Sequence, residues 1–167
     1  MNKTPLSTTF KKNSALIIAS WFQTGFSPIA SGTIGSLFAL PLAYFAIYWG
    51  GSGWVLAFTA LTFLIGKWAT KTVLKDTNET DPSFVVIDEV VGQLLTFVLL
   101  GNLLHFDMNR WYFLAGFIFF RFFDIVKVWP ACYYDEQDHS AFGILMDDVI
   151  AGLYAALSLG VLYLYCR

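Results

Sequence analysis

The sequence predicts an all-α protein, a membrane-embedded bundle with about four to five spanning helices and a short N-terminal helix. The 167 residues are 57% hydrophobic and 19% aromatic but only 13% charged, whereas soluble domains carry about 25% charged residues. The mean hydropathy is +0.61, and several apolar runs approach the roughly 20 residues that cross a bilayer. Such a composition leaves too few polar residues to cover a soluble surface. Lipid is therefore expected to cover part of the protein, and a soluble domain of buried helices is the alternative.

The N-terminal part divides into two segments. Residues 1–13 are polar and basic and are expected to form a tail that is flexible or lies at a membrane surface. Residues 14–26 predict an apolar helix that is too short to span a bilayer unaided, so spanning, re-entering and lying flat all stay open. Lysines precede a short apolar run here, but no small-residue cleavage site follows, and we interpret the segment as retained. Residues 14–167 are interpreted as one helical domain.

Five longer apolar runs follow, each interpreted as a helix. A turn of small residues, 27–36, precedes the first run, and Gly50 to Gly53 separate it from the second. A polar connection that ends at Pro82 precedes the third run. Polar loops at 105–110 and 128–143 bound the fourth run. The five runs are 34–49, 54–69, 84–104, 111–126 and 144–165.

The orientation of these runs predicts that charged side chains meet at one membrane face. Basic residues favour the cytoplasmic side, which places the N-terminus and Lys67, Lys71 and Lys75 there. If the runs then alternate in direction, the turn 27–36 and almost every ionisable residue of the runs reach the cytoplasmic face. Acidic residues at a helix start are also explained by the helix dipole, but separate helix starts do not predict a common face. The residues that gather are Asp88, Glu89, Arg121, Asp124, Lys127, Asp147 and Asp148.

This set of side chains suits a divalent cation and a phosphate. Clustered carboxylates repel one another, and a hard cation with oxygen ligands, typically Mg²⁺, relieves that repulsion. Arg121 and Lys127 offer a planar fork and a mobile point charge to a phosphate. Thr33 and Ser36 lie in a glycine-containing turn that could present N–H and hydroxyl groups to the same phosphate. A simple helix cap is the alternative for that turn.

Other chemistries fit the sequence poorly. No basic stripe with interleaved aromatic residues indicates nucleic-acid binding. Cys132 and Cys166 lie far apart without metal-ligand spacing, and nothing near Cys132 would activate a thiol. His105 and His139 fall on opposite sides of the predicted membrane, which argues against a zinc site or a Ser-His-Asp arrangement.

Four sequence blocks carry a resemblance to a known family. In chain order they are S-P-I-A-S-G-T-I-G-S, I-D-E-V-V-G-Q, F-R-F-F-D-I-V-K-V-W-P and G-I-L-M-D-D-V-I-A-G, and they run from about residue 25 to residue 152. Together they resemble the phosphatidylglycerophosphatase A family. The resemblance implies a Mg²⁺-dependent phosphatase of the bacterial cytoplasmic membrane, multi-pass, with its active site on the cytoplasmic face. Its substrate would be phosphatidylglycerol phosphate in the membrane, and its products phosphatidylglycerol and inorganic phosphate, a step of phospholipid biosynthesis.

The resemblance also suggests roles for individual residues. We expect Asp88, Glu89 and Asp148 to bind Mg²⁺, with Asp124 and Asp147 as further ligands or a base, so that all five acids are catalytic. Arg121 and Lys127, with Thr33 and Ser36 of the turn, are expected to bind the substrate phosphate. Attack by water and an aspartyl-phosphate intermediate both stay open, and the sequence predicts no oligomeric state. The alternatives are another membrane phospholipid-phosphate phosphatase or phosphotransferase, and, ranked lower, a divalent-ion transport protein.

Overall fold

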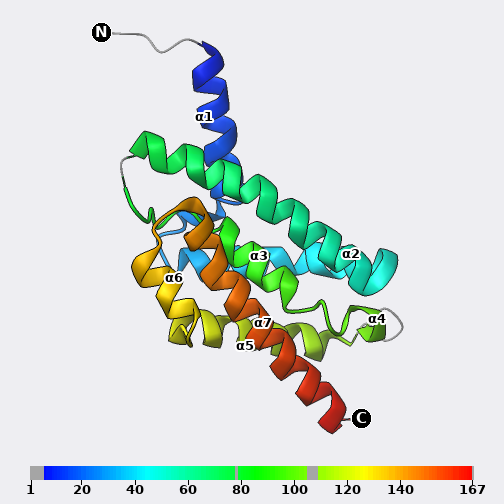
Figure 1. The fold of residues 1–167 in the computed structure, drawn as a ribbon. Coiled ribbons are helices and arrows are strands. Elements are labelled where there is room, and N and C mark those ends of the chain that lie inside the picture. The colour runs from blue at the N-terminus through cyan, green and yellow to red at the C-terminus, as the bar shows by residue number, and fades with distance from the viewer. Residues whose placement is uncertain (1–5, 78, 105–108, 167) are drawn as a thin grey trace.

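The structure is a computed structural model that describes residues 6–77, 79–104 and 109–166. Over these residues the protein is helical and contains no strand, which confirms the predicted all-α class (Figure 1). The elements in chain order are α1 (Leu6–Ala19), the 3₁₀ turn η1 (Thr24–Phe26), α2 (Ser31–Thr77), α3 (Ile87–Leu95), α4 (Gly101–Leu104), α5 (Arg110–Val126), α6 (Ala131–Gln137) and α7 (Ala141–Cys166).

Helix α2 consists of two arms that fold back at a glycine pair, as predicted for Gly50 to Gly53 (Figure 1). Gly50 and Gly51 leave helical geometry, and Gly51 has a φ of +62°, a left-handed conformation that disfavours residues with a Cβ atom. The second arm continues to Thr77, well beyond the predicted end near residue 69. Lysine-rich turns therefore extend the helix past its apolar part.

Helix α3 is the buried centre of the bundle. It packs against α2, α7 and α5, and seven of its nine residues are buried. The prediction of one continuous helix over 84–104 is wrong, because α3 ends at Leu95 and α4 begins only at Gly101. Between them the amide N–H groups of Phe97 and Val98 donate to carbonyls three residues back, at 3.1 and 3.0 Å. These short-range bonds tighten the chain into turns and end the α-helical ladder.

The predicted helices over 111–126 and 144–165 are present as α5 and α7, although α7 begins earlier, at Ala141. The segment 128–143 contains the short helix α6 as well as loop, which corrects the prediction of a loop throughout. Ala131 at the start of α6 is buried, so apolar contact with the bundle accompanies this helix. Helix α6 packs against the first part of α7.

The N-terminal region is also helical from an earlier point than predicted. Helix α1 begins at Leu6, inside the segment 1–13 assigned to a tail, and ends at Ala19 rather than near residue 26. Residues 1–5 lie outside the described residues. Trp21, Phe22 and Gln23 then adopt positive φ values and reverse the chain before η1.

Two helices are long and apolar enough to cross a membrane by length and composition, namely α2 and α7. That number is smaller than the four to five predicted spans. The described part of the chain nevertheless keeps many large apolar side chains exposed, including Phe38 and Trp49 on α2, Ile118 on α5 and Leu164 on α7. An apolar exterior of this kind is typical of a surface covered by lipid.

Candidate active site

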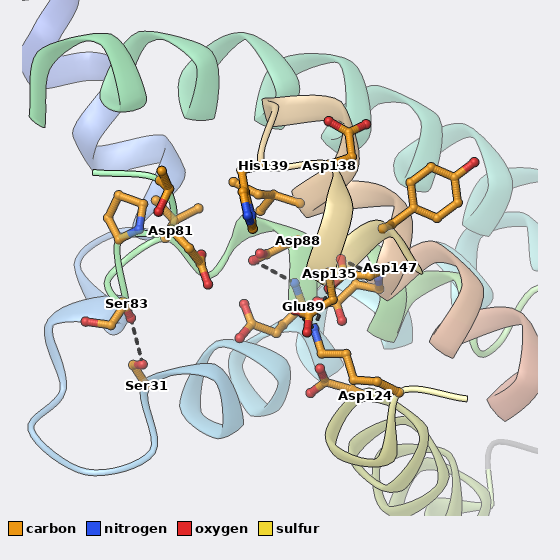
Figure 2. Close-up of a pocket in the computed structure, with 17 residues that line it drawn as sticks. Ser31, Asp81, Ser83, Asp88, Glu89, Asp124, Asp135, Asp138, His139 and Asp147 are labelled. Atoms are coloured by element: carbon orange, nitrogen blue, oxygen red, sulfur yellow. Dashed lines mark hydrogen bonds and ion pairs between the residues drawn. The ribbon is translucent and has the colours of Figure 1, made fainter. Parts of the chain in front are cut away.

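A pocket of about 410 Å³ lies at one end of the bundle, where α2 and α3 begin and α5 ends (Figure 2). Residues 80–85, helix α6 and the first turns of α7 complete its wall. The predicted site residues Asp88, Glu89, Asp124, Lys127, Asp147 and Asp148 all line it. The expectation that these six side chains meet at one end is therefore confirmed, whereas Arg121, Thr33 and Ser36 do not line the pocket.

The two acidic pairs enter the pocket from different positions in their helices. Asp88 and Glu89 lie in the first turn of α3, where the amide N–H of Glu89 donates to Oδ1 of Asp88 at 3.0 Å. A favourable helix-dipole interaction explains this pair in part. It does not explain Asp147 and Asp148, because α7 begins at Ala141 and the pair is buried in its second turn. Burial of two adjacent acids inside a helix calls for partners or a ligand.

Close backbone contact between α3 and α7 positions these acids. A Cβ atom on Gly152 would overlap the carbonyl oxygen of Gly92, and one on Gly92 would overlap the carbonyl oxygen of Asp148. Asp88 precedes Gly92 by four residues, and Asp148 precedes Gly152 by four, so each acid lies one helical turn from the crossing point. Small residues let the helix axes approach closely, as in many membrane helix pairs. The glycine contact thus brings a carboxylate of α7 beside those of α3.

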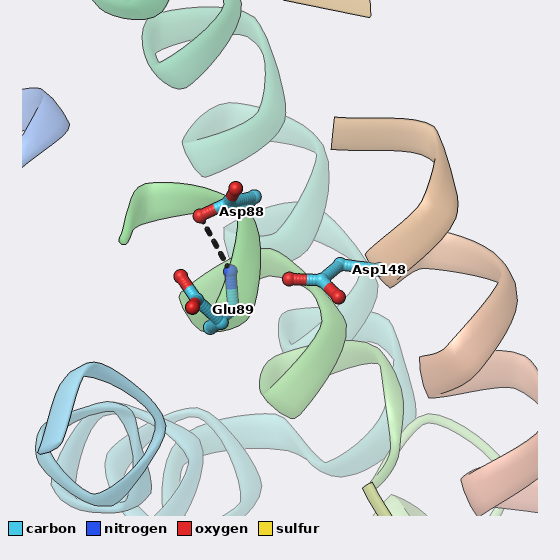
Figure 3. Close-up of side chains that lie close together, drawn as sticks. All are labelled: Asp88, Glu89 and Asp148. Carbon is cyan, nitrogen blue, oxygen red and sulfur yellow. Dashed lines mark hydrogen bonds between the residues drawn. The ribbon is translucent and has the colours of Figure 1, made fainter. Parts of the chain in front are cut away.

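Asp88, Glu89 and Asp148 form a compact carboxylate cluster (Figure 3). Each contributes an oxygen atom, and these oxygens lie within 4.8 Å of one another. The Oε2 atom of Glu89 is buried and has no hydrogen-bond partner among the described residues. Carboxylate oxygens at this spacing suit a hard divalent cation, so these three residues could hold a metal ion.

Arg121 lies beside this cluster and is held by α2 and α5. Its Nη1 atom is 2.5 Å from Oδ2 of Asp124 and donates to the Ser36 hydroxyl at 3.3 Å. Ser36 is fully buried and donates in turn to the carbonyl of Gly32. A Cβ atom on Gly32 would overlap the Glu89 carboxylate and lie 3.3 Å from Nη1 of Arg121. Gly32 therefore leaves room for the acid and the guanidinium to lie close together.

The predicted turn contributes to the site differently from expectation. Ser36 orients Arg121 from a buried position, and Thr33, also predicted to bind substrate, is half-buried and lies outside the pocket lining. Ser31 does line the pocket, with its hydroxyl donating to the carbonyl of Ser83 at 2.9 Å. The glycines of the turn contribute to the site by allowing close packing against Glu89, Arg121 and Val86, and not by presenting exposed N–H donors to a phosphate.

Lys127 ends α5 and bridges two other helices. It adopts a left-handed conformation at the C-cap, with φ of 49°. Its Nζ donates to Asp135 of α6 at 2.8 Å and, in a shorter contact, to Asp147 of α7. Burial acts to lower the pKa of Lys127, but the two carboxylates outweigh it and hold that pKa above its usual range. The ammonium group is therefore charged at neutral pH.

The structure adds pocket residues that the sequence analysis did not assign. They come from segments interpreted only as polar connections, and nothing in their local pattern marks them as part of one site. One of them, Asp138, lies between α6 and α7 and accepts a hydrogen bond from the amide N–H of Ser140 at 3.0 Å. Hydrogen bonds from the side chain and backbone of Ser140 lower the pKa of Asp138. The added ionisable residues are Asp81, Asp135, Asp138 and His139.

The chain is similar to known proteins over most of its length. A family model described as Phosphatidylglycerophosphatase A matches residues 17–163. A protein of that name from Escherichia coli K12 is 34% identical over 148 residues, which is 88% of this chain and 80% of the relative. The Haemophilus influenzae protein of that name is 35% identical over 154 residues, 92% of this chain and 91% of the relative.

A further relative carries a different name. A Bacteroides thetaiotaomicron protein, provisionally named a phosphatidylinositol-3-phosphatase, is 35% identical over 156 residues. The match covers 87% of this chain and 91% of that relative. No solved structure matches the chain.

Proposed function

This chain belongs to the phosphatidylglycerophosphatase A family, and from that premise we propose that it hydrolyses phosphatidylglycerol phosphate in phospholipid biosynthesis. In the net reaction the bond from the phosphorus of the terminal monoester to the glycerol oxygen is replaced by a bond to the oxygen of water. A proton of that water goes to the glycerol oxygen, so that phosphatidylglycerol and inorganic phosphate are released.

The observation that carries this proposal is the meeting of the acids of α3, α5 and α7 with Lys127 at one pocket, beside which Arg121 is paired with Asp124. The described lining is dominated by carboxylates and includes one lysine. Such a pocket would repel a phosphate monoester unless further positive charge were bound there. The family's substrate is an anion, so the charge balance itself supports a cation-dependent reaction.

We propose Asp88, Glu89 and Asp148 as the ligands of a Mg²⁺ ion. Their oxygens lie within 4.8 Å of one another, and the buried Oε2 of Glu89 lacks a partner among the described residues. Oxygen-only ligands match the preference of Mg²⁺. When bound, Mg²⁺ would offset the negative charge of the cluster and of the transferring phosphoryl group.

The remaining side chains would bind and orient the phosphate. Arg121 would offer its guanidinium from beside the carboxylate cluster, oriented by Asp124 and Ser36. Lys127 would offer its ammonium from the pocket wall, oriented by Asp147. Asp124 and Asp147 are thereby paired with cations, and we assign them a positioning role in catalysis. Cations fixed in advance stabilise charge that develops on the phosphoryl oxygens.

We further propose that the protein is a multi-pass protein of the bacterial cytoplasmic membrane with the pocket on the cytoplasmic face. The two arms of α2, with α5 and α7, would be the spanning helices, and the α3–α4 segment would cross inside the bundle. The first arm of α2, residues 31–49, is roughly 28 Å long, and α5 roughly 25 Å, close to the roughly 30 Å hydrocarbon thickness. Exposed apolar residues on α2, α5 and α7 support this arrangement.

Phosphate release by the purified protein in detergent micelles tests the function. Phosphatidylglycerol phosphate and phosphatidylinositol 3-phosphate are supplied in parallel, each with Mg²⁺ and with EDTA. We expect release from the first lipid, dependent on Mg²⁺ and lost in Asp88→Asn. Faster release from the inositol lipid would mean that the protein has the activity named for the Bacteroides relative instead. Full activity of Asp88→Asn would refute the proposed site.

A further inference from the structure

Lys127 already has an anionic partner in the place where a substrate phosphate would bind. An ammonium group has three N–H donors. Two of them are used by Asp135 and Asp147, both of which line the same pocket as Lys127. A phosphate that approaches Lys127 therefore meets a cation that is already paired.

The two partners of Lys127 differ in how firmly they are held. The Asp147 side chain is 7% exposed and lies in the second turn of α7, inside the bundle. The Asp135 side chain is 42% exposed and lies on α6, a helix of seven residues. Exposed ion pairs contribute only about 0.2–1 kcal/mol, so the contact with Asp135 is the one that can be exchanged at small cost.

We infer that Asp135 occupies Lys127 in the free protein and is displaced by the phosphate monoester of the substrate, so that it weakens phosphate binding by competition. The inference rests on the proposed function. A phosphate monoester carries up to two negative charges and three acceptor oxygens, so it competes well with a single carboxylate. Removal of this competing carboxylate should therefore tighten the binding of any phosphate ligand of Lys127 by a similar factor.

Inorganic phosphate is the probe that tests this inference without the lipid. Calorimetric titration in Mg²⁺ buffer is expected to give a Kd about 1.5- to fivefold lower for Asp135→Asn than for the wild type, the fold-change that corresponds to an exposed ion pair. In the lipid assay KM is expected to fall by a similar factor, with a smaller change in kcat. Binding of a phosphodiester, glycerophosphoglycerol, should tighten by a similar factor if it displaces the same carboxylate from Lys127.

Two further variants separate competition for Lys127 from general effects. Glu136→Gln removes the same charge from the adjacent position of α6, outside the pocket lining, and is expected to leave the phosphate Kd unchanged. In a Lys127→Met background, Asp135→Asn should cause no further tightening, since the contested cation is gone. If the contact between Lys127 and Asp135 only held α5 and α6 together, Asp135→Asn would instead weaken phosphate binding.

The outcomes distinguish this inference from the proposed function. Weaker phosphate binding by Asp135→Asn, or equal tightening by Glu136→Gln, overturns the role of Asp135 even if the wild type hydrolyses the lipid. Absence of lipid hydrolysis by the wild type refutes the proposed function. Tighter phosphate binding by Asp135→Asn would still show the competition at Lys127.

Discussion

The two ends of the bundle are held together by different interactions. At the pocket end, half-buried acids of α3 lie close to buried acids of α7, beside Arg121 and Lys127. At the opposite end, the turn of α2 packs against α4 through neutral groups. The amide N–H of Ser52 donates to Oδ1 of Asn102 at 2.9 Å, and the amide N–H of Asn102 donates to the Ser52 hydroxyl at 3.1 Å.

This difference separates the groups that serve function from those that serve stability. Like charges buried together oppose folding until a cation binds. Paired neutral groups and closely packed glycines favour folding without offering any chemistry. Substitutions at the pocket end should therefore reduce activity with little loss of stability, and substitutions at the α2 turn should do the reverse.

The largest expected effect is that of Asp148→Asn at the pocket end. Loss of a carboxylate from the metal cluster should lower kcat/KM by about 10²- to 10³-fold, the range for a group that stabilises transition-state charge. Because repulsion with Asp88 and Glu89 is relieved, the melting temperature in EDTA should stay the same or rise. Thermal unfolding in detergent and phosphate release measure the two effects.

Addition of Mg²⁺ provides the matching control for that variant. The wild type should gain thermal stability with increasing Mg²⁺, as any ligand of the native state requires, and Asp148→Asn should lose most of that gain. Glu136→Gln, a charge change outside the pocket, should behave as the wild type. A variant Asp148→Asn that unfolds at a lower temperature in EDTA would contradict the comparison of the two ends.

Gly51→Ala should have the largest effect at the α2 turn. Gly51 has a φ of +62°, and an added Cβ atom would overlap the Asn102 side chain. A left-handed non-glycine residue costs about 1–3 kcal/mol, and the overlap adds to that, so we expect a loss of about 2–4 kcal/mol in the free energy of unfolding. Activity per folded molecule should persist.

Gly53→Ala is the control for this prediction. It lies two residues away on α2, and a Cβ atom on it would have no neighbour within 4 Å. Alanine is favoured over glycine in a helix, so this variant should be as stable as the wild type or slightly more so. Equal destabilisation by both substitutions would show that neither the positive φ of Gly51 nor its close contact with Asn102 causes the loss of stability.

The sequence predicted the location of the site better than its details. Orientation rules brought Asp88, Asp124, Lys127 and Asp147 to one end because helix direction follows from the order of apolar runs and lysines. Asp135 and His139 could not be assigned to the site from the sequence, since a polar loop carries no periodic pattern that shows which side chains turn inward. Contacts of this kind depend on where α6 packs, which is a tertiary property.

The third apolar run shows a second limit of sequence reasoning. Hydropathy alone does not distinguish a helix that faces lipid from a segment buried inside the bundle, and residues 84–104 are largely buried. The turns after Leu95 are possible there because neighbouring helices surround the backbone. The close contact between Gly92 of α3 and Gly152 of α7 could likewise not be predicted from the sequence, because it depends on how the two helices are placed relative to each other.

Asn102→Ala should have an intermediate effect at the α2 turn. The change removes the Oδ1 acceptor of the Ser52 amide, and loss of a hydrogen bond to a backbone group costs about 0.5–1.5 kcal/mol. Ser52→Ala removes the reciprocal bond from Asn102 and should cost a similar amount or less. Chemical denaturation of both single variants and the double variant measures their coupling. Fully additive losses would argue against a shared contact between these two residues.

Lys67→Gln should have the smallest effect, and it tests whether position at the pocket end is enough to affect activity. The Nζ atom of Lys67 lies 4.9 Å from the centre of the Phe142 ring, at the start of α7, but Lys67 does not line the pocket. An exposed cation–π contact contributes about 0.5–1 kcal/mol, so stability should fall by at most that amount while kcat/KM stays unchanged. Lys71→Gln, one turn further along α2, removes the same charge and serves as the control. A large loss of activity in Lys67→Gln alone would mean that the functional region extends beyond the pocket to the outer face of α2 and α7.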